Sequence, residues 1–352
     1  MRTTEVSQRA PSRAPQHIGG IDTLRLICAV WVMMSHLGGL PVAGLLTAVG
    51  ARSCLVRLAA SANGIAFDGV AAVVVFFVIS GFCIHLPYAS GKAFDTREFW
   101  IRRMIRVGLP LIAATLLAHA LTGRDGVLDP VLWSLYCELI YYSLYPAFRA
   151  LVRIVSWSGL LIFSIAPMIA VFAFVQNPSG FLWGYGLSLT WVYGLPVWIS
   201  GAVLASRLDS ILTILARWQI PAIRTFVWLA SSIATALHFH SPVRYAASMI
   251  VFAPIAYLWL QWEIADAVAH GTVRVFERLG QGGYSLYLIH PLALSLVAGL
   301  QTDRIVKFGI GLASCACLTF VFFWTVERPS HQLARWLARK SIRVGVELRA
   351  VR

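Results

Sequence analysis

Long runs of apolar residues, one after another along the chain, constrain its fold more than any other feature of the sequence. Each run is near the roughly 20 residues that a helix needs to cross a bilayer. Hydrophobic residues make up 59% of the chain and charged residues 12%, whereas a soluble domain has about 25% charged residues. Ten runs can be marked, at residues 21–40, 66–88, 107–122, 131–148, 157–175, 181–205, 220–238, 245–262, 284–300 and 305–326. The sequence therefore predicts an all-α, polytopic bundle of about ten transmembrane spans. For 181–205, which glycines and a proline interrupt, a partly re-entrant segment is the alternative.

The positive charge of the chain is distributed unevenly between the loops. The formal net charge is +14, which by itself is compatible with a polyanionic partner. With ten spans and the N-terminus inside, however, all but six of the 29 lysines and arginines fall on the cytoplasmic side. This is the positive-inside pattern of membrane proteins. We therefore expect both termini in the cytoplasm, the lipid bilayer as the surroundings and no nucleic-acid partner; attraction of a polyanionic cytosolic ligand stays open.

One integral membrane domain accounts for most of the chain. Residues 1–17 are polar and basic and contain prolines, so we expect a disordered cytoplasmic lead there. The membrane domain is expected at 18–330 and a basic cytoplasmic tail at 331–352. The cysteines lie mostly in apolar runs and do not have the spacing of a zinc site, so no metal site is predicted.

The first apolar run carries two ionisable residues, Arg25 and His36. Eleven residues turn a helix by three full turns plus about 20°, so both side chains are expected on one face, about 16 Å apart along the axis. Ionisable residues inside a membrane are costly and are functional candidates by default. The alternative is an arginine that reaches the lipid headgroups and a histidine that is hydrogen-bonded within the bundle.

Two further segments add polar groups to the candidate site. Ser80 and Gly81 interrupt the second run in FFVISGFCIH, where close helix packing by small residues is the structural alternative. Farther on, Arg102, Arg103 and Arg106 share one helix surface, because residues three and four apart are neighbours. Guanidinium groups bind phosphate through two parallel hydrogen bonds. The arginine cluster is therefore a candidate site for a phosphorylated ligand, and anchoring to lipid headgroups is the alternative.

The remaining ionisable candidates lie in two later runs. Glu138 lies about 10 Å below the outer end of the fourth run, with Ser134 one helical turn before it. In the ninth run Tyr287 lies one turn before His290. Counted from their own ends of the bundle, Glu138 and His290 come out at the depth expected for His36, near the middle of the bilayer. A structural glutamate and a core histidine are the alternatives, but three ionisable groups at one level favour a functional site.

Taken together, these segments resemble the integral-membrane acyltransferase-3 family, which contains bacterial O-antigen, Nod-factor and macrolide O-acyltransferases. The resemblance is to the stand-alone form of the family and implies a place in the bacterial inner membrane. It rests on segments that follow one another in the family's order: Arg25 with His36, FFVISGF (76–82), RRMIR (102–106), LWSLYCE (132–138), YSLYLIHP (284–291) and VERP (326–329).

The resemblance also implies an activity and roles for particular residues. The activity is transfer of an acyl group, often acetyl, from a cytosolic acyl-CoA to a hydroxyl of a carbohydrate, a glycolipid or another acceptor, with no tightly bound cofactor. By position, His36 matches the catalytic histidine, Arg25 its paired basic residue and Glu138 the acidic partner. The residues expected to bind the donor are Ser80, Arg102, Arg103 and Arg106.

Acyl transfer needs a base for the hydroxyl proton, hydrogen-bond donors for the developing oxyanion and a grip on the donor. We predict His36 as the base and Glu138, or a hydroxyl, as the group that fixes its tautomer. Tyr287 or Ser80 is predicted to face the oxyanion. Ser134 and His290 are further candidates.

Two alternatives to this mechanism stay open. In the first, His36 is itself acylated before the acceptor arrives. The second comes from a different class of protein, a proton-coupled transporter or a flippase for lipids or glycans, which would also use midplane histidine and glutamate residues. Transporters often have two similar halves, and the sequence shows no such symmetry.

Overall fold

The apolar runs of the sequence fold into helices. The computed structural model describes residues 18–177, 179–208, 216 and 218–350, with side chains up to Ser341, and within this part of the chain no residue is in a strand. The expected lead, 1–17, lies outside the described residues. The helices are α1 (Ile21–His36), α2 (Val42–Ala48), α3 (Ser53–Ala66), α4 (Gly69–Ala89), α5 (Thr96–Thr122), α6 (Asp129–Phe174), α7 (Gly186–Ser206), α9 (Gln219–His240), α10 (Tyr245–His270), α11 (Arg274–Gly280), α12 (Gly283–Ala298), α13 (Arg304–Phe322) and α14 (Arg328–Ala350).

Several of these helices begin where the sequence supplies a capping carboxylate. Asp68 accepts a hydrogen bond from the backbone N–H of Ala71 at the start of α4, and Asp95 accepts one from Glu98 at the start of α5. Such side chains satisfy backbone N–H groups that have no partner in the first helical turn. Asp68 also accepts hydrogen bonds from Thr235 of α9 and Tyr245 of α10. The buried carboxylate of Asp68 therefore connects the start of α4 with the last turns of α9 and the start of α10.

The predicted all-α membrane bundle is confirmed, but the number of ten spans is not. Seven helical segments of the described chain are long and apolar enough to cross a membrane. Helices α1 and α12 have 16 residues each, which is about 24 Å of helix against roughly 30 Å of hydrocarbon. Helix α6 covers two of the expected spans, 131–148 and 157–175. Its backbone breaks between them at Ser156, where φ is 63°, so the two halves are separate helical segments. The re-entrant alternative for 181–205 is not observed, since α7 runs unbroken after the short 3₁₀ turn Leu182–Tyr185.

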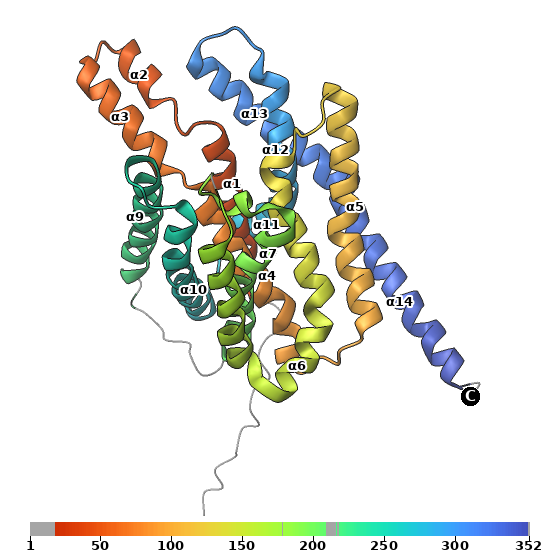
Figure 1. Ribbon diagram of the computed structural model, residues 1–352. Helices are drawn as coiled ribbons and strands as arrows, with labels where there is room; N and C mark the ends of the chain where they lie inside the picture. Colours follow the sequence, from red (N-terminus) through yellow and green to blue (C-terminus); the bar gives the residue numbers. More distant parts are fainter. Residues whose placement is uncertain (1–17, 178, 209–215, 217, 351–352) are drawn as a thin grey trace, which may run out of the picture.

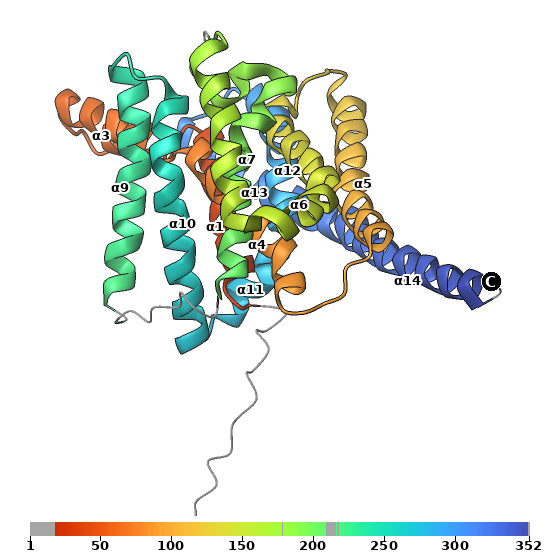
Figure 2. The same cartoon turned by 60° about the horizontal axis from the view of Figure 1, so that its bottom comes forward.

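The helices form a bundle with two projecting elements (Figures 1 and 2). Helices α9 and α10 make up one side of the bundle, α5 lies at the other side, and α4 and α7 pack against each other between them. The hairpin of α2 and α3 projects at the end where α1 stops. Helix α14 leaves the bundle obliquely after packing against α5 (Figure 2). We call the end where α4 stops and α5 begins the arginine end, because Arg102, Arg103 and Arg106 lie in the first turns of α5.

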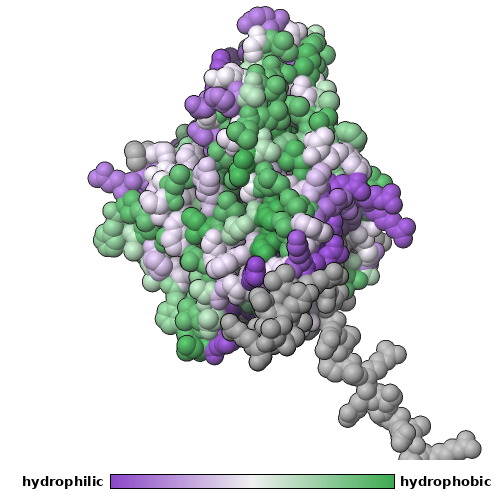
Figure 3. Space-filling model, turned by 90° about the vertical axis from the view of Figure 1, so that its right-hand side faces the viewer, coloured by the Kyte–Doolittle hydropathy of each residue, from purple (hydrophilic) through white to green (hydrophobic). Residues whose placement is uncertain are grey.

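The surface of the bundle is suited to lipid. Leu109, Ile112 and Leu116 of α5 point outward and are 41%, 59% and 66% exposed. Figure 3 shows one face on which many hydrophobic residues, mixed with residues of intermediate hydropathy, run from the top through the middle, while strongly hydrophilic residues form separate patches. In water so large an apolar surface would be unfavourable. The exposed surface therefore agrees with the membrane location that the composition predicts.

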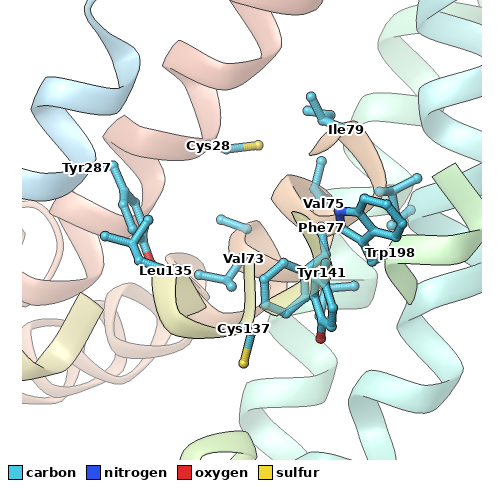
Figure 4. Packing of buried hydrophobic residues seen from close by; sticks show 14 of the residues in the cluster. Cys28, Val73, Val75, Phe77, Ile79, Leu135, Cys137, Tyr141, Trp198 and Tyr287 are labelled. Carbon is cyan, nitrogen blue, oxygen red and sulfur yellow. The ribbon is translucent and has the colours of Figure 1, made fainter. Parts of the chain in front are cut away.

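Large aromatic side chains fill the centre where α4, α6 and α7 meet (Figure 4). Tyr141 of α6 lies between Phe77 of α4 and Trp198 of α7, with ring centroids 5.7 and 5.6 Å away. Its hydroxyl donates to the carbonyl oxygen of Trp191, 2.8 Å away. Because this core is close-packed, it holds the polar side chains of the same three helices in fixed positions.

Candidate active site

The contact between α4 and α7 places the first polar residue of the site. A Cβ atom on Gly81 would lie 1.8 Å from the carbonyl oxygen of Trp198, and one on Gly201 would lie 2.0 Å from that of Val78. Only glycine permits backbones to approach this closely. The indole N–H of Trp198 can therefore reach the hydroxyl of Ser80, at 3.1 Å. Close helix packing at Gly81 is therefore observed, and Ser80 faces the interior, where its predicted role in donor binding stays a prediction.

Ser80 belongs to a three-residue cluster built on Glu138. The Ser80 hydroxyl donates to Oε1 of Glu138 at 2.7 Å, and the phenol of Tyr142, one turn farther along α6, donates to the same oxygen. Ser80 and Tyr142 are buried, with 8% and 5% of their surface exposed. A carboxylate inside a membrane bundle needs such donors, because there is little water to solvate it.

The three arginines of α5 separate into two groups. Arg103 and Arg106 line a large cavity, whereas Arg102 forms an ion pair with Glu98, 2.8 Å away, on its own helix. Arg25 of α1 lines the same cavity and is held by Asp22 at 2.9 Å, one turn before it. The cavity thus receives guanidinium groups from α1 and α5.

This cavity is the largest feature of the site, with a volume of about 1300 Å³. Exposed arginines surround it at the arginine end, half-buried ones follow, and the hydroxyls and carboxylate of the Ser80 cluster lie deeper. The lining has six arginines against three carboxylates, so its charge favours an anion. The charged lining residues are Asp22, Arg25, Arg103, Arg106, Glu138, Arg278, Glu327, Arg328 and Arg335.

Beyond the Ser80 cluster, a second pair of hydroxyls joins α6 to α12. Ser134 and Tyr287 lie 2.6 Å apart and both line the cavity. Figure 4 shows the ring of Tyr287 beside Leu135, at the edge of the apolar core. The predicted candidates Ser80, Ser134, Glu138 and Tyr287 are therefore brought to one cavity.

His36 and His290 form a separate pair. Nδ1 of His36 lies 2.7 Å from Nε2 of His290, and the two rings meet edge to edge, with an interplanar angle of 27° and centroids 5.0 Å apart. His290 is fully buried, whereas His36, the last residue of α1, is exposed. Here the structure differs from the sequence-based mechanism, which expects Glu138 or a hydroxyl beside His36. Within the described residues, the hydrogen bonds of Glu138 go to Ser80 and Tyr142.

The cavity stops close to the two histidines without reaching them. Its lining includes Met33, one helical turn before His36, and Leu286 and Tyr287, one turn before His290. These three side chains are 5–7% exposed. A layer made of Met33, Leu286 and Tyr287, which we call the separating layer, therefore lies between the cavity and the histidine pair.

Two residues of the site escaped the sequence analysis. Glu327 is 1% exposed and accepts hydrogen bonds from the backbone and the hydroxyl of Ser285. It lies in a π-helical turn, Phe323–Glu327, between α13 and α14. Its signal in the sequence is weaker than that of Glu138, because it directly follows the last apolar run (305–326) instead of interrupting it, but it is part of the VERP segment. The second residue is Trp198, and nothing in the sequence indicates that its indole contacts Ser80.

A second cavity, of about 520 Å³, lies between α1, α4, α9 and α10. Most of its lining is apolar, and its arginine, Arg224, is held by two hydrogen bonds to Glu263, at 2.7 and 2.8 Å. Within the described residues, no group of three or more His, Cys, Asp or Glu side chains is arranged to hold a metal ion. The larger cavity is therefore the better candidate for an active site.

Fold and site define a helical membrane protein with a large, basic, partly polar cavity that is lined by six arginines. A family model described as an acyltransferase domain, that of the acyltransferase-3 family, matches residues 18–327. The chain belongs to this family, and the predicted resemblance is confirmed. No curated protein and no solved structure gives a significant match.

Membership of the family makes the protein a membrane acyltransferase, an enzyme that transfers acyl groups. The match begins at the first described residue and ends at Glu327, so it covers every predicted site residue. The expected boundary between domain and tail, at 330/331, falls inside α14, which continues as one helix from Arg328 to Ala350.

Proposed function

We propose that the enzyme transfers an acyl group, with acetyl as the expected one, from acyl-CoA to a hydroxyl of a carbohydrate, a glycolipid or another acceptor. The observation that carries the proposal is the cavity of about 1300 Å³, with arginines at its entrance and hydroxyls at its depth. Binding pockets for small molecules are about 300–1000 Å³. A cavity of this size suits a long ligand such as a coenzyme A thioester.

The phosphate groups of coenzyme A fit the arginine end of the cavity. Arg103 and Arg106 come from one face of α5, and Arg278, Arg328 and Arg335 lie around the same cavity. Guanidinium groups bind phosphate oxygens through charge-assisted hydrogen bonds. In the proposal the phosphates stay among these arginines, and the thioester end extends toward the Ser80 cluster.

The chemical step needs a base near the acceptor, for which His36 is our candidate. Its exposed position allows a hydroxyl acceptor to approach from the end opposite the arginines. Tyr287 and Ser134 supply hydroxyl groups on the cavity side that can face the developing oxyanion. Since the separating layer lies between them, transfer requires Met33, Leu286 or Tyr287 to move. The base route and the acyl-histidine route both use His36.

The positive-inside pattern orients the proposal in the membrane. If the arginine end faces the cytoplasm of a bacterium, the cavity opens to the compartment that contains acyl-CoA. The acceptor would then meet His36 from the other side of the inner membrane. The transporter or flippase alternative gains no support from the family membership, which supports acyltransferase activity.

Donor binding is tested with acetyl-CoA and purified protein in detergent or proteoliposomes. Arg103→Ala and Arg106→Ala should each weaken acetyl-CoA binding by about tenfold or more, because a charge-assisted hydrogen bond contributes about 1.5–3 kcal/mol. Arg102→Ala is the matched control, since Arg102 is bound to Glu98 and is not part of the cavity lining. Calorimetric titration of the three variants measures the difference.

Transfer itself is followed with radiolabelled acetyl-CoA and membranes of the producing cell as the source of acceptors. His36→Ala should abolish transfer and retain acetyl-CoA binding, because His36 is outside the cavity. Unchanged donor affinity in both Arg103→Ala and Arg106→Ala would identify the arginines as lipid anchors. Normal transfer by a folded His36→Ala variant would refute its role as base.

A further inference from the structure

The hydrogen bond between His36 and His290 has a definite donor and a definite acceptor. The backbone carbonyl of Leu286 determines which ring is which. Nδ1 of His290 lies 3.0 Å from the carbonyl oxygen of Leu286, one turn earlier in α12. A carbonyl oxygen can only accept a hydrogen bond, so this nitrogen carries a proton. A neutral imidazole has one N–H group, and Nε2 of His290 is therefore an acceptor. The hydrogen between the two rings then belongs to Nδ1 of His36.

From this chain of hydrogen bonds we infer that His290 is a positioning residue that locks His36 in one tautomer. With its proton on Nδ1, His36 has its lone pair on Nε2, the nitrogen that faces away from His290. His290 thus fills the place that the sequence-based mechanism gives to Glu138. The inference rests on the proposed function, in which His36 acts on the acceptor hydroxyl.

The histidine pair also provides a path for the proton of the acceptor hydroxyl during transfer. Nε2 of His36 takes the proton of the acceptor hydroxyl as the oxygen attacks the thioester carbonyl carbon. The C–S bond then breaks, and the thiolate of coenzyme A takes up that proton. While His36 carries both protons, its Nδ1–H becomes a charge-assisted donor to Nε2 of His290, and such bonds are about twice as strong as neutral ones. His290 therefore stabilises the charged intermediate state more than the resting one.

A neutral partner suits this position in the bundle. His290 is 0% exposed, and a carboxylate at the same place would be a buried charge with a large desolvation cost. The bond from Nδ1 to Leu286 fixes the ring within α12, independently of any substrate. His36 is by contrast at the exposed end of α1. Among the described residues, the hydrogen-bond partner that orients it is the buried ring of His290.

Two substitutions of similar polarity separate the proposed role from a purely structural one. In His290→Gln the side-chain oxygen can reach the position of Nε2 and accept from His36. In His290→Asn the amide reaches only the position of Nδ1, so it can donate to Leu286 and leaves His36 without its acceptor. We expect His290→Asn to lower kcat about 10- to 100-fold, on the scale of the loss caused by removing the hydrogen-bond partner that orients a metal-binding histidine. His290→Gln should stay within a few-fold of the unsubstituted enzyme, and both should keep its KM for acetyl-CoA.

The ¹⁵N spectrum of histidine-labelled protein is a second readout and needs no acyl transfer. We expect His36, assigned by comparison with His36→Ala, to show a protonated Nδ1 and an unprotonated Nε2. In His290→Asn this preference should be lost. A protonated Nε2 on His36 in the unsubstituted protein would overturn the inference, even if every variant failed to fold. Equal kcat for the folded Asn and Gln variants would also overturn it.

Failure of the proposed function gives a different result. If acetyl-CoA is neither bound nor consumed while the ¹⁵N spectrum shows the expected tautomer, the histidine pair stands and the acyl-CoA proposal fails. If transfer proceeds and the tautomer differs, the proposed function stands and the role of His290 fails.

Discussion

The acidic residue of the site, Glu138, serves two hydroxyl donors through one oxygen. Ser80 reaches it from α4, and Tyr142 reaches it from one turn farther along α6. The Ser80 cluster therefore depends on a hydrogen-bond acceptor at this position, whether or not that acceptor is charged. This separates the structural role of Glu138 from its electrostatic role, because glutamine keeps the acceptor and removes the charge.

We expect Glu138→Gln to keep most of the stability and Glu138→Ala to lose about 1–3 kcal/mol of unfolding free energy, the cost of leaving buried polar groups without a partner. If the negative charge takes part in transfer, both variants lose activity. Reversible unfolding in detergent and acetyl transfer, measured on the same preparations, give the two quantities. Equal stability of the two variants would contradict the hydrogen-bonding account.

Individual candidate residues could be predicted from the sequence, but their partners on other helices could not. Arg25, Ser80, Glu138 and Tyr287 were identified because polar groups inside apolar runs are costly. The sequence gives the depth of a residue along its helix, but not the neighbouring helix that its side chain faces. The direction of each side chain around its helix depends on packing between segments far apart in sequence. His36 and His290 are 254 residues apart, and Glu138, at a similar expected depth, faces Ser80 instead.

At the scale of helices, the crossing of α4 and α7 holds the site together. Two glycines on different helices each face a backbone carbonyl of the other helix. The two helices can therefore touch along their backbones, as small residues allow in membrane proteins. This contact carries Ser80 and Trp198 to within hydrogen-bonding distance.

Gly81→Ala should destabilise the bundle, because its Cβ would lie 1.8 Å from the carbonyl oxygen of Trp198 and the helices would have to separate. Overpacking of this kind costs about 1–3 kcal/mol or more. Gly108→Ala in α5 is the matched control, since a Cβ there meets nothing within 4 Å; alanine should stabilise that helix by up to about 1 kcal/mol. Melting temperatures in detergent compare the two. A Gly81→Ala variant as stable as Gly108→Ala would show that α4 and α7 are not in close contact.

Most spanning helices, but not the accessory ones, follow from hydrophobic runs. The break in α6 was anticipated, because 149–156 separates two apolar runs and contains Arg149 and Arg153. The hairpin of α2 and α3 falls in 41–64, which reads as an outer loop, and neither helix has a buried residue. Helix α14 occupies the expected basic tail. Such segments lack a long apolar run, which is the signal on which the prediction relies.

At the scale of the whole molecule, the two ends of the bundle differ in charge and in access. The arginine end opens into the cavity, and the opposite end has His36 and the projecting hairpin of α2 and α3. The positive-inside pattern predicts that this hairpin lies outside the cytoplasm.

Cys54, exposed at the start of α3, gives a direct test of that orientation. A membrane-impermeant maleimide should label it in intact spheroplasts, and Cys54→Ser should remove this label. Of the other cysteines, Cys317 is also exposed, but it lies inside the apolar run 305–326, where lipid limits the access of a water-borne reagent. Labelling that appears only after the membrane is permeabilised would reverse the orientation of the whole molecule.

The separating layer of Met33, Leu286 and Tyr287 has a consequence for the energy supply of the cell. With the proposed orientation, water reaches the cavity from the cytoplasm and reaches His36 from the other side. A continuous water path between them would conduct protons and discharge the gradient that drives ATP synthesis. We expect these buried, mostly apolar side chains to interrupt such a path in the resting enzyme, so that the membrane stays electrically insulating.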